Sequence, residues 1–252
     1  MNLKEALSDY LLRLADNALI LGHRLSEWCG HAPILEQDIA ITNISLDFIG
    51  QSRMLYQYAA EIEGKGRTED DLAYLRDVKD FRNVLLVEQP NEDWAYTIIR
   101  QFLYDAYSFY FHKELCKSKD PLLAAYAEKA IKEVTYHLRW SSEWVIRLGD
   151  GTAESKQKIQ VALNDYYTYA AELLEPNEVD NIMAEEGIGV DLQYIKPLVE
   201  ERINMVLEEA TLQKPKQQWA KGGGKNGIHT EHLGYILAEM QYLQRTYPNA
   251  TW

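Results

Sequence analysis

Apolar residues recur at intervals of three and four positions along most of the chain, and strict alternation of apolar and polar residues is almost absent. This spacing is typical of amphipathic helices, which bury one face. Within residues 3–28, for example, Leu11, Ala15, Ala18, Leu19 and Leu25 follow it. The pattern therefore predicts an all-α fold.

Turn and capping residues divide this pattern into separate helices. Cys29 and Gly30 end the first helix, Pro33 suits the first turn of the second, and Asp120 with Pro121 begins the fourth. Long helices are expected over residues 3–28, 33–64, 91–116, 121–148, 152–174 and 191–212, short ones in 68–89 and 177–186, and a last one from about 230. Pro197 should bend its helix or start a new one. Because no long linker and no internal repeat interrupts the chain, we predict a single helical-bundle domain over residues 1–252.

The charge balance narrows the classes of partner. The chain carries 26 Lys and Arg against 39 Asp and Glu, a formal net charge of −13. Such a field repels phosphate backbones and anionic lipid, which argues against nucleic acid and membranes. No signal peptide and no apolar stretch of the roughly 20 residues that span a bilayer is visible. Cys29 and Cys116 suggest neither a disulfide framework nor a zinc site, so we expect a cytoplasmic protein.

Each of the first four long helices carries an acid near its middle, on a face that we expect to point inward. These acids are Asp16, Asp47, Asp105 and Glu133. One carboxylate from each of four adjacent helices is the arrangement of di-iron carboxylate bundles. In those bundles two of the helices supply a Glu-x-x-His pair, because imidazole completes the coordination of each iron.

Both pairs are broken in this chain. Gly50 stands three residues after Asp47, and Tyr136 stands three residues after Glu133, with the histidine displaced to His137. Two interpretations stay open: an iron-binding oxidoreductase with an altered carboxylate site, or a polar core without metal. The second requires a partner for each acid, because an isolated buried charge costs several kcal/mol or becomes neutral. Candidate partners on the same helical faces are Arg53, His137, Asn43 and Gln101.

Four segments resemble one protein family. They are EWCGHAP (27–33), LLVEQPN (85–91), KAIKEVTYHLR (129–139) and GGKNGIHTEHLGYILAEMQYLQR (223–245). Together they are similar to the C subunits of bacterial phenylacetyl-CoA epoxidases, the multicomponent oxygenases of phenylacetate degradation. The similarity extends over essentially the whole chain.

The resemblance implies a ferritin-like bundle with additional C-terminal helices and a role as a non-catalytic subunit. It further implies pairing with a catalytic A subunit, which holds the di-iron centre, and contact with other subunits of the complex. No cofactor is then expected in this chain, and NADPH acts through the reductase of the complex. The broken pairs at Gly50 and Tyr136 agree with this division of labour. Self-association is a further possibility.

Residues 213–227 form a predicted loop that contains four lysines and no acid, in an otherwise acidic chain. The lysines are Lys214, Lys216, Lys221 and Lys225. Three interpretations remain: a solvated connection, a docking surface for an acidic face of the A subunit, or a contact for the phosphates of coenzyme A. The sequence does not decide between them.

Two further motifs have both a functional and a purely structural interpretation. His229 and His232 flank Thr230 and Glu231, which suggests half of a metal site or simply the start of a helix, where Thr can cap and Glu complements the helix dipole. The aromatic residues between Trp94 and Phe111 surround the third helix on all sides. A helix that is apolar all round is buried in a core or covered by a partner.

Overall fold

The computed structural model describes residues 1–216, 220–248 and 250, and these residues fold into helices, turns and loops without a β-strand. The predicted all-α class is thereby confirmed, and the helical content is consistent with a ferritin-like bundle. The chain separates into two compact units, one of residues Met1–Pro90 with Gly222–Trp252 and one of residues Asn91–Lys221. The single-domain organisation stays a prediction.

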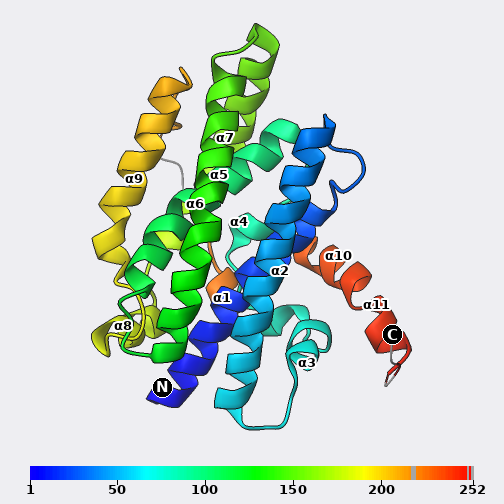
Figure 1. Cartoon of the computed structure of the whole chain (residues 1–252), viewed down its shortest axis with the longest axis vertical. Coiled ribbons are helices and arrows are strands. Elements are labelled where there is room, and N and C mark those ends of the chain that lie inside the picture. Colours follow the sequence, from blue (N-terminus) through cyan, green and yellow to red (C-terminus); the bar gives the residue numbers. More distant parts are fainter. Residues whose placement is uncertain (217–219, 249, 251–252) are drawn as a thin grey trace. The chain divides into compact units, whose positions relative to one another are not determined.

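The first unit is built on an antiparallel pair of long helices, α1 (Leu3–Ser26) and α2 (Leu35–Glu63), which run side by side (Figure 1). The Asn2 side chain caps α1, and Gly64 ends α2 in the left-handed conformation, with φ of 71°. Gly22 allows the two helices to approach closely, because a Cβ there would lie 3.2 Å from Ile49 Cδ1. The Ser45 hydroxyl donates to the Gly22 carbonyl across this contact.

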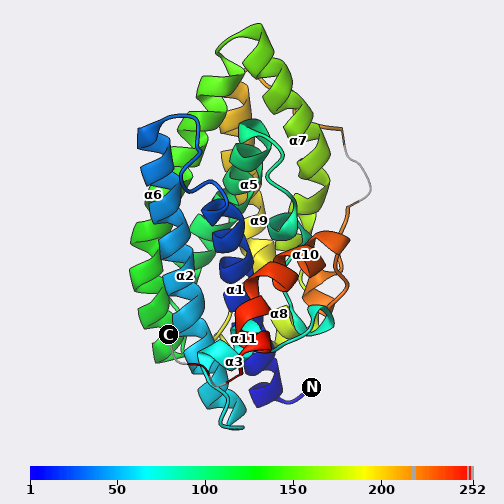
Figure 2. The ribbon, with the colours of Figure 1, turned by 90° about the vertical axis from the view of Figure 1, so that its right-hand side faces the viewer.

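Short helices complete the first unit, as predicted for residues 68–89. They are α3 (Glu69–Tyr74), the 3-10 helix η1 (Val78–Asp80) and α4 (Leu85–Glu88). The C-terminal segment returns to them through η2 (Gly224–Asn226), α10 (Glu231–Met240) and α11 (Tyr242–Thr246), the last two of which are labelled in Figure 2. Helix α10 packs on α4 and η1. The approach at Gly224 requires glycine, because a Cβ would lie 2.0 Å from the Asn83 carbonyl oxygen.

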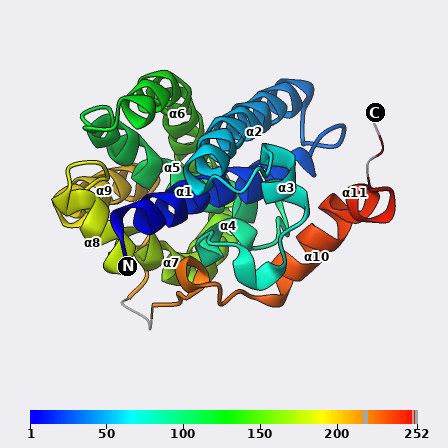
Figure 3. The same cartoon turned by 90° about the horizontal axis from the view of Figure 1, so that it is seen from below.

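The second unit contains α5 (Trp94–Leu115), α6 (Pro121–Gly149), α7 (Ala153–Leu174), α8 (Glu178–Glu185) and α9 (Leu192–Glu209). Helix α5 contacts α6, α7 and α9, and Figure 3 shows it among them. This position explains the aromatic residues of α5: Phe102, Tyr104, Tyr107 and Phe111 are buried core residues.

Two details of the helix prediction need correction. Helix α9 runs through Pro197 as one helix, so a new start there is wrong. Its apolar face buries Ile195, Val199 and Ile203, and this burial outweighs the single backbone hydrogen bond that proline removes. The last helix is two helices, because the chain turns at Gln241, whose amide donates to the Ala73 and Arg76 carbonyls. No helix in the described ranges is long and apolar enough to cross a bilayer.

Candidate functional site

Asp16 lies at the centre of the buried polar core of the first unit. Arg76, from the segment after α3, places its guanidinium against both Asp16 oxygens: Nη2 donates to Oδ1, and Nη1 donates to Oδ2 over 3.1 Å. The Tyr56 hydroxyl donates to Oδ1 at 2.5 Å, and the Arg82 backbone N–H donates to Oδ2 at 2.7 Å. An ionised carboxylate accepts about four hydrogen bonds. Asp16 is therefore saturated.

The electrostatics of this cluster favour the charged guanidinium of Arg76 and the neutral phenol of Tyr56. Burial by itself lowers the pKa of Arg76, but the charges and hydrogen bonds of Asp16 and Tyr56 outweigh it and raise that pKa above its ordinary value. Burial and the neighbouring Asp16 charge raise the pKa of Tyr56 well above its usual range. The guanidinium also stacks on the Phe81 ring, 4.2 Å from its centroid. A bidentate guanidinium thus occupies the side of Asp16 that a metal ion would need.

Asp105 is a fully buried acid of the second unit, and its partners differ in kind from those of Asp16. Gln101 Nε2 donates to Asp105 Oδ1 at 2.7 Å, and the Ser141 hydroxyl donates to Oδ2 at 2.8 Å. Burial raises the pKa of Asp105 to about 7, against the opposing effects of the His137 charge and of these two hydrogen bonds. Gln101, one of the candidate partners of the inward acids, thus binds Asp105 directly, whereas His137 acts on it through its charge.

His112, also buried on α5, is held as a neutral ring. Its Nδ1 lies 2.7 Å from the Ser108 carbonyl and donates to it, and its Nε2 accepts from the Tyr126 hydroxyl at 3.1 Å. Burial lowers the pKa of His112 to about 4, although the Ser108 hydrogen bond opposes this effect. Both ring nitrogens of His112 therefore take part in hydrogen bonds within the core of the second unit.

Our prediction of the face of α2 that points inward is wrong. Asn43 is exposed, Asp47 is half-buried, and a Cβ on Gly50 would meet no atom within 4 Å. The buried face of α2 carries bulkier apolar residues instead, among them Ile41, Ile44, Phe48 and Leu55. Burying these side chains releases more free energy than burying a stripe that includes Asn43 and Asp47.

The candidate site residues on α6 lie partly in the core and partly at the surface. His137 is buried and Glu133 is half-buried, while Tyr136 is 39% exposed and packs beside Arg139, whose guanidinium lies 5.7 Å from its ring centroid. The residue that stands where a di-iron bundle carries its histidine thus faces outward. The predicted partners Arg53 and Asn43 are also wrong, because Asn43 is exposed and Arg53 pairs with Glu69 at the surface.

The donor set does not fit a di-iron centre. Asp16 is saturated by Arg76, Tyr56 and the Arg82 backbone, Gly50 offers no side-chain donor atom, and Tyr136 points away from the core. Across residues 1–216, 220–248 and 250, no three His, Cys, Asp or Glu side chains gather as a metal would need. The assignment of these positions as a degenerate metal site stays a prediction.

A second buried carboxylate of the first unit, which the sequence pattern did not predict, anchors the C-terminal segment. Glu88 accepts from Asn83 Nδ2, from the Thr230 backbone N–H and hydroxyl, and from His229 Nδ1 at 2.9 Å. His229 Nε2 lies 3.0 Å from the Phe81 carbonyl. Since both His229 nitrogens face acceptors, both must donate, and the ring is an imidazolium. His229 therefore serves as an internal cation rather than as a metal ligand.

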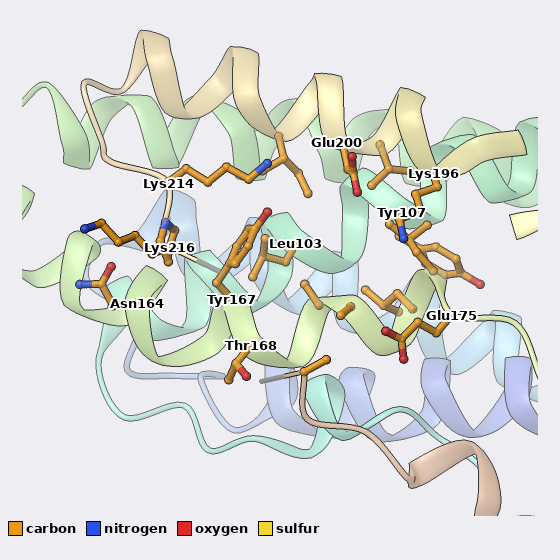
Figure 4. A pocket seen from close by; sticks show the side chains of 18 residues that line it. Leu103, Tyr107, Asn164, Tyr167, Thr168, Glu175, Lys196, Glu200, Lys214 and Lys216 are labelled. Atoms are coloured by element: carbon orange, nitrogen blue, oxygen red, sulfur yellow. The ribbon is translucent and has the colours of Figure 1, made fainter. Parts of the chain in front are cut away.

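The four lysines of the predicted loop, residues 213–227, lie in different surroundings. Residues 217–219 of that loop are outside the described ranges. Lys214 and Lys216 line a cavity between α5, α7 and α9 (Figure 4). Lys221 stacks on the Tyr169 ring, with Nζ 4.7 Å from its centroid, while Lys225 lies in η2 of the first unit. The four lysines therefore have different surroundings, and the proposed contacts with a partner or with coenzyme A stay predictions.

Comparison with known proteins gives two matches. The model of the family described as phenylacetic acid catabolic protein matches residues 2–252. The C subunit of the 1,2-phenylacetyl-CoA epoxidase from Escherichia coli (strain K12) is 51% identical over 246 residues, which cover 98% of this chain and 99% of that protein. The resemblance of the four sequence segments is thereby confirmed.

Proposed function

Because the chain belongs to the phenylacetic acid catabolic protein family, we propose that it is the non-catalytic structural subunit of a multicomponent di-iron monooxygenase that epoxidises the aromatic ring of phenylacetyl-CoA. In this role it binds a catalytic A subunit and supports its activity in phenylacetate degradation, together with the other subunits. The di-iron centre belongs to the A subunit, and NADPH delivers electrons through the reductase. The cytoplasm stays our prediction for its location.

One observation supports the non-catalytic role: the carboxylate of Asp16 is fully occupied by hydrogen-bond donors of this chain. All of its hydrogen-bonding capacity is used by Arg76, Tyr56 and the Arg82 backbone. A bound iron would have to displace a guanidinium and leave that cation buried without its partner, which costs about 3–5 kcal/mol. The contacts of Asp16 in the core of the first unit thus stabilise the fold and oppose the binding of iron.

A reconstitution experiment tests the proposal. The purified chain is mixed with the catalytic A subunit, the mass of the complex is measured by light scattering, and phenylacetyl-CoA turnover is assayed with the reductase and NADPH. We expect a stable hetero-oligomer, and turnover that requires both chains. Asp47→Asn and Glu133→Gln should retain turnover, because neither carboxylate takes part in the reaction. Loss of turnover by either variant with an intact complex, or full turnover without this chain, contradicts the proposal.

A further inference from the structure

The second unit contains a cavity of about 350 Å³, which is at the small end of the range for ligand pockets. Helices α5, α7 and α9 and residues 214–216 surround it. Its walls include the side chains of Leu103, Val199 and Ile203, which belong to the buried core of this unit. The cavity therefore reaches from the surface to an apolar interior, where an apolar group of a ligand would replace water.

Three lysines line this cavity: Lys196, Lys214 and Lys216. Among the described residues none of the three forms an ion pair, although the chain contains 39 acids against 26 basic residues. Two partners of Lys214 in the described ranges are neutral groups: Nζ donates to Asn204 Oδ1 at 2.9 Å and lies 5.8 Å from the Tyr167 ring centroid. These ammonium groups are available to an incoming anion.

The charges are distributed unevenly along the cavity. Figure 4 shows Lys214 and Lys216 entering from the loop at one end, and a single lysine, Lys196, with Tyr107 and Glu175 at the other. Glu175 and Glu200 also line the cavity, and their carboxylates disfavour a second anionic group near them. The arrangement suits a molecule with its anionic group at one end and an uncharged apolar body.

We propose that this cavity binds an anionic amphiphile, with its carboxylate or phosphate at Lys214 and Lys216 and its apolar chain or ring between α5, α7 and α9. All of its lining residues belong to this chain, so binding can be measured without the A subunit. A free carboxylic acid offers a carboxylate and a coenzyme A thioester offers phosphates; lysine ammonium groups bind both anions, and the test separates these two sources.

The first test compares two dyes that differ in charge. The dye 8-anilinonaphthalene-1-sulfonate carries an anionic group, and N-phenyl-1-naphthylamine has the same rings without it. Fluorescence titration of the full chain should show saturable binding of both dyes. The double variant Lys214→Gln/Lys216→Gln should weaken binding of the sulfonate about tenfold and leave the neutral dye unchanged. Lys221→Gln is the matched control, because it removes a charge from the same loop outside the cavity.

A cavity-filling variant makes the second test. Ala171 lines the cavity from α7, so Ala171→Trp should abolish binding of both dyes, while its melting temperature reports whether it folds. Dodecanoate and phenylacetyl-CoA are then compared as competitors of the sulfonate dye. Displacement by dodecanoate points to free acids, and displacement by phenylacetyl-CoA points to the thioester. Displacement by neither, equal weakening by Lys221→Gln and the double variant, or undiminished binding in a folded Ala171→Trp would overturn the proposal.

Discussion

The two units each bury an acid in the middle of a long helix, but they stabilise it in different ways. Asp16 on α1 has a guanidinium, a phenol and a backbone N–H as partners, whereas Asp105 on α5 has an amide and a hydroxyl, with His137 close enough to influence its pKa. The first acid belongs to a fixed ion pair. The second has a pKa near neutrality, so its charge changes with pH.

This difference shows that one sequence pattern, an acid on an apolar helical face, can occur in two different chemical environments. An acid on an apolar helical face indicates burial, but its partners decide whether it is a permanent charge, a titrating group or a metal ligand. The partners of Asp16 come from outside its own helix. Those of Asp105 lie one turn away at Gln101 and on the facing helix α6 at Ser141.

The largest effect should follow from removing Arg76. In Arg76→Met the charge of Asp16 stays buried without its guanidinium, so we expect the free energy of unfolding to fall by about 3–5 kcal/mol at pH 7. Urea denaturation followed by circular dichroism measures this change. Arg53→Met is the matched control, because Arg53 is 70% exposed in its pair with Glu69 and should lose less than about 1 kcal/mol. Equal losses in the two variants would mean that the buried pair has no special role.

The next effect concerns Asp105 and depends on pH. The folded-state pKa, about 7, lies above the unfolded value of about 3.9, so the stability contributed by the protonated acid is present at low pH and is lost as pH rises through 7. Asp105→Asn cannot titrate, and Gln101 Oε1, which accepts no hydrogen bond in the described structure, can accept from the new amide. Relative to the wild type, Asp105→Asn should therefore gain about 2 kcal/mol between pH 5 and pH 7.

A second substitution controls for size at the same position. Asp105→Ala removes both acceptors and leaves Gln101 and Ser141 without them, so we expect a loss of about 1–3 kcal/mol at pH 5. Urea denaturation of both variants at several pH values gives the two curves. A pH-independent difference between Asp105→Asn and the wild type would show that Asp105 keeps one charge state throughout.

The smallest effect should come from His229, whose partner is again a carboxylate. Burial by itself lowers the pKa of His229, but Glu88, the Phe81 carbonyl and the charge of Asp16 together raise it above its ordinary value. The stability that the imidazolium contributes is thus complete below about pH 6.5 and is lost as pH rises through the raised pKa. His229→Gln should cost about 1–2 kcal/mol at pH 6 and less at pH 9. A cost that grows with pH would contradict the charged state.

Local signals made most of the fold predictable. The capping residues Asn2, Asp93, Asp120 and Thr152 hold helix N-termini where the sequence pattern begins. The contact of Gln101 with Asp105 was also predictable, because residues four apart share a helical face.

The remaining contacts join residues far apart in the sequence. Arg76 lies 60 positions from Asp16 in an irregular segment, and His229 lies 141 positions from Glu88. No helical periodicity relates such residues, although Glu88 and His229 both occur in segments that carry the family resemblance. The face of α2 was misjudged for a related reason: two stripes compete on that helix, and only packing against α1 selects the one with Ile44 and Phe48.

We infer above all that this chain supports an oxygenase without holding its iron. The most direct test is the iron content of the purified chain after anaerobic reconstitution with Fe(II), measured by mass spectrometry with the catalytic A subunit as positive control. We predict that iron stays far below one atom per chain, because Arg76 occupies Asp16 and no histidine replaces Gly50 or Tyr136. About two irons per chain, the content of a di-iron carboxylate bundle, would contradict the account and favour the altered-site oxidoreductase.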